Sequence, residues 1–246
     1  MDSIGANRAH WNRISASYQA DHDAQIGARP RLWGAFSIDD AELGALADVA
    51  GLRVLEVGCG AGQWCWSLTA EAECVVGLDL SEIQLAVARR SLPAAGCGLI
   101  QGAAERLPFA DSSFDVVLSD HGGLSWAPPE LAVAEAARVL RAGGCLLFNV
   151  FSPLAQACYD SSADTVTSRL SGDYFGLGPV AQGGGAASYQ LTYGDWIRVL
   201  RGSGLAIDDL IEPRPEPGRS SGYYNFSPPD WARRWPCEAL WIARKP

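Results

Sequence analysis

Three glycines at alternate positions, Gly58, Gly60 and Gly62, follow an apolar run that contains the acid Glu56. A turn without side chains lets a ligand approach the main chain closely. The start of the helix beyond such a turn favours a negatively charged group. A P-loop would need a lysine and a serine or threonine directly after its last glycine, and here a Gln–Trp pair follows instead. The turn therefore does not fit a nucleoside triphosphate.

The same glycines also depart from the dinucleotide-binding fingerprint. That fingerprint, G-x-G-x-x-G/A, ends on a small residue that allows close packing of helix and strand. Counted from Gly58, the third position falls on Gln63. A nicotinamide-dependent oxidoreductase is thus an alternative that this position disfavours. A non-catalytic cofactor-binding module is a second alternative, because nothing in the sequence excludes it.

From Leu52 onward the chain alternates strand and helix patterns, and this alternation must position the glycine turn. The expected strands are residues 53–58, 74–80, 97–104, 114–120 and 145–150. The expected helices are residues 62–73, 81–92 and 130–143. Gly143 supplies a stop signal for the last of these helices. The βαβαβ order predicts a parallel sheet with right-handed crossovers.

The flanking segments carry weaker patterns. Trp11, Ile14 and Tyr18 recur at helical spacing, and a second helix is expected at about 38–49, with Asp39 or Asp40 near its start. Beyond Ser152 we expect a helix at about 162–171, a glycine-rich loop at 176–187, a strand at 188–192, a helix at 194–205, an extended segment at 206–213, a proline-rich loop at 213–236 and a strand at 238–245. The predicted organisation is an N-terminal helical segment, 1–50, and one domain, 51–246, with an insertion at about 153–187.

Four stretches, in this order, resemble the class I S-adenosylmethionine-dependent methyltransferases that act on small molecules. They are "VLEVGCGAG", "VVGLDLSE", "GAAERLPFADSSFDVVLSD" and "RVLRAGGCLLFNV". The resemblance covers residues 52–151 and extends weakly to the first helix and to "YGDWIRVL". With the element order, it predicts a Rossmann-like, doubly wound α/β fold whose mostly parallel seven-stranded sheet has helices on both faces. It implies S-adenosylmethionine as cofactor and in-line transfer of its methyl group to an oxygen, nitrogen or carbon atom of a small-molecule acceptor.

The resemblance also implies cofactor contacts. Asp79, at the end of the second strand, would accept hydrogen bonds from the ribose hydroxyls, and Ala104 and Glu105 would lie beside the adenine. The segment 1–50 would cover the cofactor as a lid. Trp11 and Tyr18 would touch its methionine end or, alternatively, dock the helix on the domain. The remaining expected cofactor contacts are Glu56, Gly58, Cys59, Gly60, Gly62, Leu80, Gln84 and Ser119.

The residues after the fourth strand are expected to reach the methyl acceptor, because open α/β sheets bind ligands at the carboxyl ends of strands. His121 is our candidate catalytic base, since imidazole titrates near neutral pH. Ordering of the loop or packing against the cofactor is the alternative role for it. Asp120 could orient His121 or stay solvated. The following aromatic residues either line an apolar acceptor pocket or fill the core: Tyr223, Tyr224, Phe226, Trp231, Trp235 and Trp241.

Composition narrows the function further. The net charge of −9 argues against broad nucleic-acid binding. Seven cysteines without a C-x-x-C pair and three well-separated histidines predict neither a disulfide framework nor a metal site. We see no apolar run of about 18 residues and no secretory signal. We therefore expect a cytoplasmic enzyme whose partner is a small molecule, with no nucleic acid or membrane partner, and the sequence leaves its oligomeric state open.

Overall fold

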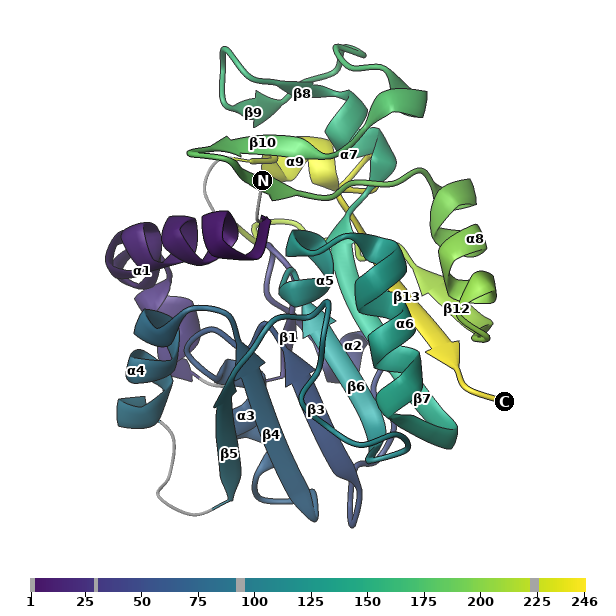
Figure 1. Cartoon of the computed structure of the whole chain (residues 1–246). Coiled ribbons are helices and arrows are strands. Elements are labelled where there is room, and N and C mark those ends of the chain that lie inside the picture. Colours follow the sequence, from purple (N-terminus) through teal and green to yellow (C-terminus); the bar gives the residue numbers. More distant parts are fainter. Residues whose placement is uncertain (1–2, 29–30, 92–95, 222–225) are drawn as a thin grey trace.

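Seven strands form the central sheet of the computed structural model, in the order β12–β13–β7–β6–β3–β4–β5 (Figure 1). Their bounds are β3 Arg53–Val57, β4 Cys74–Asp79, β5 Cys97–Gln101, β6 Phe114–Asp120, β7 Leu140–Phe151, β12 Ala206–Ile211 and β13 Glu238–Arg244. β13 runs antiparallel to both of its neighbours, and the other pairs are parallel. The predicted sheet is confirmed. The structure describes residues 3–28, 31–91, 96–221 and 226–246, without the side chains of 22–28 and 91.

The strands divide their side chains between two cores, because successive residues of a strand point to opposite faces. Four helices cover these faces: α3 Gln63–Leu68, α4 Glu82–Ser91, α6 Pro129–Val139 and α8 Tyr193–Gly202. Leu55 joins the core that contains residues of α6 and α8, whereas Val54 joins the core that contains residues of α3 and α4. Burial of such a side chain contributes about 1.5–3 kcal/mol. Both faces are therefore covered, as predicted.

The N-terminal segment forms a long helix, a small hairpin and one helical turn. Its elements are α1 Ser3–Ala28, β1 Leu32–Trp33, β2 Ile38–Asp39 and α2 Asp40–Leu43. The helix expected at 38–49 is wrong outside α2. Ile38 pairs with Trp33 across the hairpin, and Gly44, with φ 62°, ends the helix. Asp39 does cap α2, because its side chain accepts a hydrogen bond from the Ala41 amide.

Between residues 153 and 188 short elements replace the longer ones predicted, and a short helix lies in the loop expected at 213–236. The helix expected at 194–205 and the strands expected at 206–213 and 238–245 correspond to α8, β12 and β13. The short elements are α7 Pro153–Ala157, β8 Tyr159–Asp160, β9 Thr165–Val166, the 3₁₀ turn η1 Tyr174–Gly176, β10 Val180–Gly183, β11 Ala186–Ser188 and α9 Pro229–Ala232. The helix expected at 162–171 is wrong, because β9 pairs with β8 as a hairpin. The loop expected at 176–187 contains the β10–β11 hairpin, and the strand expected at 188–192 keeps only Ser188. These hairpins lie above the central sheet in Figure 1.

Three helices end at least three residues earlier than predicted. α3 stops at Leu68, α6 stops at Val139 rather than at Gly143, and α8 stops at Gly202. Leu140 is already extended and pairs with Phe114, so β7 begins directly after α6. These changes lie away from the carboxyl ends of the strands, where the predicted site residues lie.

The turn after β3 and the turn after β6 touch through their main chains. A side-chain carbon at Gly58 would lie 2.1 Å from the amide nitrogen of Gly123 and 2.6 Å from Cα of Gly122. A side-chain carbon at Gly122 would lie 2.5 Å from the carbonyl oxygen of Val57. Gly123 also begins the short helix α5, Gly123–Trp126, which was predicted only as a loop. The two turns can meet only because glycines occupy both sides.

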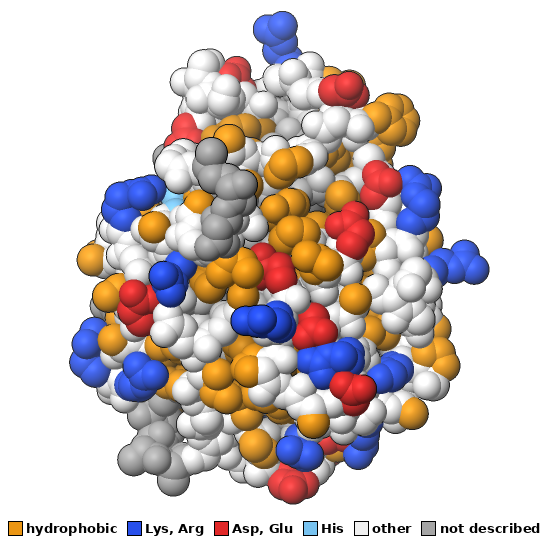
Figure 2. All heavy atoms as spheres, viewed as in Figure 1, with side chains coloured by type: hydrophobic (Ala, Val, Ile, Leu, Met, Phe, Trp, Pro, Cys, Tyr) orange, Lys and Arg blue, Asp and Glu red, His pale blue; other side chains and the backbone are white. Residues whose placement is uncertain are grey.

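The surface carries charges of both signs. On the face shown in Figure 2, the described Lys and Arg side chains are scattered among acidic and hydrophobic ones and form no single basic patch. Two strongly exposed hydrophobic side chains, Leu170 and Phe175, belong to the insertion. Within residues 3–28, 31–91, 96–221 and 226–246, no helix has both the length and the apolar character that a membrane span needs.

The contact between the two turns predicts unequal effects of alanine at two glycines. Gly58→Ala should lower the free energy of unfolding by about 3 kcal/mol or more, because the new methyl group meets main-chain atoms that cannot rotate away. Gly44→Ala is the control: its φ is also positive, at 62°, but nothing lies within 4 Å of the added carbon. It should cost only about 1–2 kcal/mol. Denaturant unfolding measures both values, and equal losses would contradict the contact.

Candidate functional site

A cleft opens at the carboxyl ends of β3, β4 and β6, with about 940 Å³ of empty space, open solvent included. The candidate residues that line it are Trp11, Tyr18, Glu56, Gly58, Cys59, Gly60, Asp79, Leu80, Gln84, Ala104, Glu105 and His121. Two candidates do not line it. Gly62 caps α3, and the Ser119 hydroxyl donates to the Val57 carbonyl at 2.8 Å.

Asp79 is the last residue of β4, and its side chain hydrogen-bonds to the turn after β3 and to the turn after β4. Its Oδ2 accepts a hydrogen bond from the Gly60 amide, and its Oδ1 accepts one from the Ser81 amide, both at 2.8 Å. Burial raises the pKa of this carboxyl above its ordinary value, and the amide hydrogen bonds oppose the shift. A carboxylate has about four lone-pair sites. Asp79 therefore keeps acceptor capacity toward the cleft.

The glycines after β3 have different surroundings. The bare main chain at Gly58 faces the turn after β6, whereas a side-chain carbon at Gly60 would have only Oε1 of Gln84 within 4 Å, at 3.8 Å. This corrects the expectation that a ligand alone demands a turn without side chains. The packing of the turn after β3 against the turn after β6 explains why residue 58 must be glycine. Gly60, with φ 51°, is the glycine whose main chain faces open space in the cleft.

Buried ionisable groups lie under the glycine turn. Glu56 is 5% exposed and accepts a hydrogen bond from the Cys65 amide at 2.9 Å. Burial raises the pKa of Glu56 to about 8, so its carboxyl is mainly protonated at neutral pH. A hydrogen bond with Cys65 lowers the pKa of the Cys59 thiol, but burial and nearby carboxylates outweigh it and raise that pKa to about 12. Cys59 is therefore a space-filling thiol and not a nucleophile.

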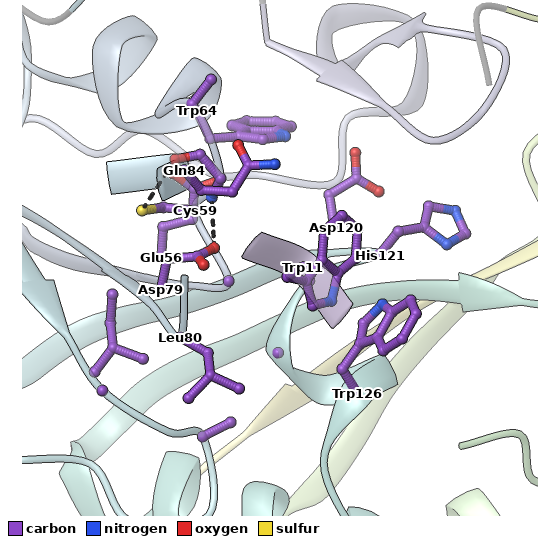
Figure 3. A pocket seen from close by; sticks show the side chains of 18 of the residues that line it. Trp11, Glu56, Cys59, Trp64, Asp79, Leu80, Gln84, Asp120, His121 and Trp126 are labelled. Carbon is purple, nitrogen blue, oxygen red and sulfur yellow. Dashed lines mark hydrogen bonds between the residues drawn. The ribbon is translucent and has the colours of Figure 1, made fainter. Parts of the chain in front are cut away.

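α1 forms one wall of the cleft. The Trp11 ring packs edge-on against Trp126 of α5, with centroids 4.8 Å apart, and against Tyr18 at 5.3 Å. The Gln19 amide donates to Oε1 of Gln84 on α4 at 2.6 Å. Trp11 and Tyr18 therefore dock the helix and line the cleft at once. Figure 3 shows Trp11 between the glycine turn and the turn after β6.

Asp120 and His121 lie at the end of the cleft beside Trp126 (Figure 3). His121 has φ 48°, which is uncommon for a residue other than glycine. Its Nε2 forms a short hydrogen bond with Oε1 of Glu238, and the two side chains are 10% and 1% exposed. Glu238, and not Asp120, is therefore the carboxyl group hydrogen-bonded to the imidazole. Asp120 accepts hydrogen bonds from the Gly34 amide at 2.9 Å and from the Asn149 side chain at 3.0 Å.

The carboxyl groups around His121 set its basicity. Burial lowers the pKa of His121, but the hydrogen bond and charge of Glu238, with the charge of Asp120, raise it above its ordinary value overall. Burial and the charge of Glu238 raise the pKa of Asp120, and His121 opposes that shift. Sequence reasoning missed Glu238 and Asn149. The signal that could have found Glu238 is an acid that begins an otherwise apolar strand.

The C-terminal aromatic residues have several locations. Phe226 stacks on Phe151, with centroids 3.8 Å apart, and the Phe151 ring also lies 4.4 Å from the His121 ring. Trp231 and Trp241 are buried in the core, whereas Trp235 is 46% exposed. None of these four aromatic residues is among the described residues that line the cleft. Tyr223 and Tyr224 lie outside the described residues.

Comparison with known proteins agrees with this architecture. A family model described as a methyltransferase domain matches residues 55–148. A demethylmenaquinone methyltransferase of Clavibacter sepedonicus is 32% identical over 171 residues, which cover 68% of each chain. A fatty-acid O-methyltransferase of Mycolicibacterium smegmatis is 40% identical over 111 residues, or 44% of this chain and only 40% of that protein. A solved S-adenosylmethionine-dependent methyltransferase of Mesorhizobium loti has 26% identity and a TM-score of 0.66, with 83% of this chain and 95% of that chain covered.

The match to the family model runs from within β3 to within β7, and it includes the glycine turn, Asp79 and His121. The structural match extends over most of the chain. The seven-stranded sheet agrees with the structural match. The chain therefore belongs to the class I methyltransferases, whose cofactor is S-adenosylmethionine.

Proposed function

We propose that the protein transfers the methyl group of S-adenosylmethionine to a small-molecule acceptor. The observation that carries the proposal is one cleft that joins Gly60 and Asp79 to the Asp120–His121 turn. Cofactor and acceptor must share one space, because an in-line displacement aligns both on the same carbon atom. When bound, the cofactor supplies a methyl group on a positively charged sulfur, which activates that group for displacement.

The cleft fits this cofactor chemically. Its acidic lining consists of Glu56, Asp79, Glu105 and Asp120. No Lys or Arg within the described parts of the chain lines it, and an acidic cleft suits a ligand with a net positive charge. Nε1 of Trp64, which also lines the cleft, is buried and has no hydrogen-bond partner among the residues that the structure describes. A ligand carboxylate would satisfy this donor, whose isolation otherwise costs about 1–3 kcal/mol.

The proposed roles follow from position. Asp79 would accept hydrogen bonds from the ribose hydroxyls through the lone pairs that its amide contacts leave. Leu80, Ala104 and Glu105 would surround the adenine, and the Gly60 main chain would approach the methionine part. We propose that the N-terminal segment acts as a lid that excludes water from the reacting atoms. Its contacts through Trp11 support that role.

His121 is the proposed base, because it lies in the same cleft as Asp79 and is paired with a buried carboxyl group. A base is needed when the acceptor must lose a proton as it takes up the methyl group. The names of two relatives, a fatty-acid O-methyltransferase and a demethylmenaquinone methyltransferase, support a small acceptor with an apolar part.

Two measurements test the proposed function. Isothermal titration calorimetry should detect binding of S-adenosylmethionine and of its demethylated product, and no binding of NAD. Binding of NAD without either sulfur compound would favour the oxidoreductase alternative instead. Transfer of a labelled methyl group to a panel of small metabolites separates an enzyme from a non-catalytic binding module.

Gly60→Val should reduce cofactor affinity by at least about 100-fold, because its side chain would occupy space that the cofactor needs against the main chain. Gly44→Val is the matched control. Gly44 has a similar positive φ and open space around the added carbon, and it lies outside the cleft lining. It should bind like wild type in calorimetry, with a comparable loss of thermal stability. Normal binding by Gly60→Val would remove this turn from the cofactor site.

Glu56 should couple cofactor binding to proton release. Its pKa of about 8 in the free protein leaves it protonated at pH 7, and a positively charged ligand favours the ionised form. Affinity should therefore rise with pH up to about 8 and level off above it, with release of up to about one proton at pH 7. Calorimetry in buffers of different ionisation enthalpy counts that proton. Glu56→Gln should abolish the release, and release that persists in this variant would assign it to another group.

A further inference from the structure

The buried side chain of Asn7, near the start of α1, hydrogen-bonds to two segments that are distant in the chain. Its Nδ2 donates to the Trp126 carbonyl of α5 at 2.6 Å and to the Ala187 carbonyl of β11 at 3.0 Å. Its Oδ1 accepts a hydrogen bond from the Ala187 amide at 2.8 Å. The donors and the acceptor of Asn7, which is 1% exposed, therefore all have main-chain partners. One asparagine links α1, α5 and the β10–β11 hairpin.

The β10–β11 hairpin is bonded to Asn7 along the edge of β11. Ala187 lies opposite Ala181 of β10, and its amide and carbonyl groups both pair with Asn7. The side-chain amide thus takes the place that a further strand would take beside β11. Directly after β11, the Tyr189 amide donates to the Ser125 carbonyl of α5 at 2.8 Å. Figure 1 shows the hairpin above the N-terminal end of α1. Helix and hairpin are therefore one hydrogen-bonded unit.

Asn7 also bears on where two aromatic residues of the cleft lie. Asn7 and Trp11 are four residues apart on α1 and so share one face of the helix. Trp11 lines the cleft and packs on Trp126, the residue whose carbonyl accepts from Asn7. No described residue of β10 or β11 lines the cleft. Any influence of the hairpin on the cleft therefore passes through its neighbours α1 and α5.

We propose that Asn7 is a positioning residue that joins α1 to the β10–β11 hairpin, so that both segments open and close over the cleft as one joint lid. This inference rests on the proposed function, in which the N-terminal segment excludes water from the reacting atoms. It gives the glycine-rich stretch of the insertion a role. Gly183, Gly184 and Gly185 form the turn of this hairpin, and all three have positive φ. A ligand that closes the joint lid would then order the hairpin without contacting it.

The two sides of α1 differ in how easily their contacts break. On the side of α4, the Asn12 side chain donates to Oε1 of Glu82 in a solvent-exposed hydrogen bond at 2.8 Å. Water can replace such a partner at little net cost. Loss of the Asn7 contacts would instead leave an amide and two carbonyl groups of the main chain without these partners, around a side chain that is 1% exposed. The joint lid should therefore open on the side of α4, while Asn7 keeps helix and hairpin together.

Hydrogen–deuterium exchange measured by mass spectrometry tests the joint lid in the wild-type protein. The ligand is S-adenosylhomocysteine, the demethylated product. It should slow exchange by at least about threefold in residues 3–21 of α1 and also in residues 180–188 of the hairpin, because a closed lid opens less often. Residues 159–166, which contain the β8–β9 hairpin, are the internal reference and should not respond. Slower exchange in α1 alone would overturn the joint lid.

Asn7→Ala removes the link and introduces a residue that favours a helix. In this variant S-adenosylhomocysteine should still slow exchange in residues 3–21, but exchange in residues 180–188 should no longer respond. Dissociation of S-adenosylhomocysteine, followed by stopped-flow fluorescence, should become about tenfold faster or more, because the helix is then held on one side only. A hairpin that responds as in wild type would contradict a link through Asn7.

Asn12→Ala is the matched control, because Asn12 lies on the same helix and bonds to Ser81 and Glu82 at the start of α4. This variant should also speed dissociation, yet the response of residues 180–188 to S-adenosylhomocysteine should remain. If both variants remove that response, the effect is a general loosening of α1, and the role of Asn7 is contradicted.

Exchange without ligand separates this inference from the proposed function. In ligand-free Asn7→Ala, exchange in residues 3–21 and 180–188 should rise together by at least about tenfold, with residues 159–166 unchanged. If S-adenosylhomocysteine fails to bind the wild-type protein, this joint rise would support the link and count against the proposed function. No rise, a rise in only one of the two segments, or an equal rise in residues 159–166 would overturn the link.

Discussion

The main chains of the turns after β3 and β6 approach so closely that the glycines where they meet leave no room for a side-chain carbon, and the cleft depends on this contact. Glycine accepts the φ of 81° that Gly58 needs, and it leaves Gly123 free to begin α5 against that turn. The contact fixes the Asp79 end of the cleft relative to the His121 end. Two reactants that must align on one carbon atom would thus be positioned by packed backbone rather than by mobile side chains.

Burial explains the electrostatics of this cleft. Burial raises the pKa values of Glu56 and Asp120. No Lys or Arg in the described lining offsets these shifts, and His121 opposes the shift of Asp120 only in part. A positively charged ligand would reverse part of these shifts, because it stabilises the ionised carboxylates. The N-terminal hairpin contributes in another way. The amides of Gly34 and Ala35 donate to Asp120 and Glu238, so a segment expected only as a cover also holds the two carboxyl groups at the His121 end of the cleft.

The strands that carry the cleft were predictable because each is a short apolar run that ends in a polar residue or a glycine. Parallel strands bring their carboxyl ends to one edge, so Asp79 and His121 were expected to share a site before any contact was known. Ser119 was expected among the cofactor contacts, but it does not line the cleft. The reason is that side chains alternate between the two faces along β6. Asp120 faces the cleft, whereas the preceding hydroxyl turns back to the Val57 carbonyl. Gly58 was identified correctly as a residue that must lack a side chain, but its neighbour is another turn.

Contacts between residues that are distant in the sequence determine the features that local sequence patterns did not predict. Local pattern favoured a helix at 38–49, and the pairing of Ile38 with Trp33 overrides it. Glu238 stands out in the sequence as an acid that begins an apolar strand, but this pattern does not distinguish an acid that meets water from one that is buried. That difference comes from the Ala35 amide, 203 residues away in sequence. The motifs of the cleft are local because the residues proposed to bind the cofactor lie in turns, each formed by a short stretch of sequence. The polar cluster around His121 is assembled from four segments, so its decisive carboxylate becomes visible only once the sheet has brought β13 beside β7.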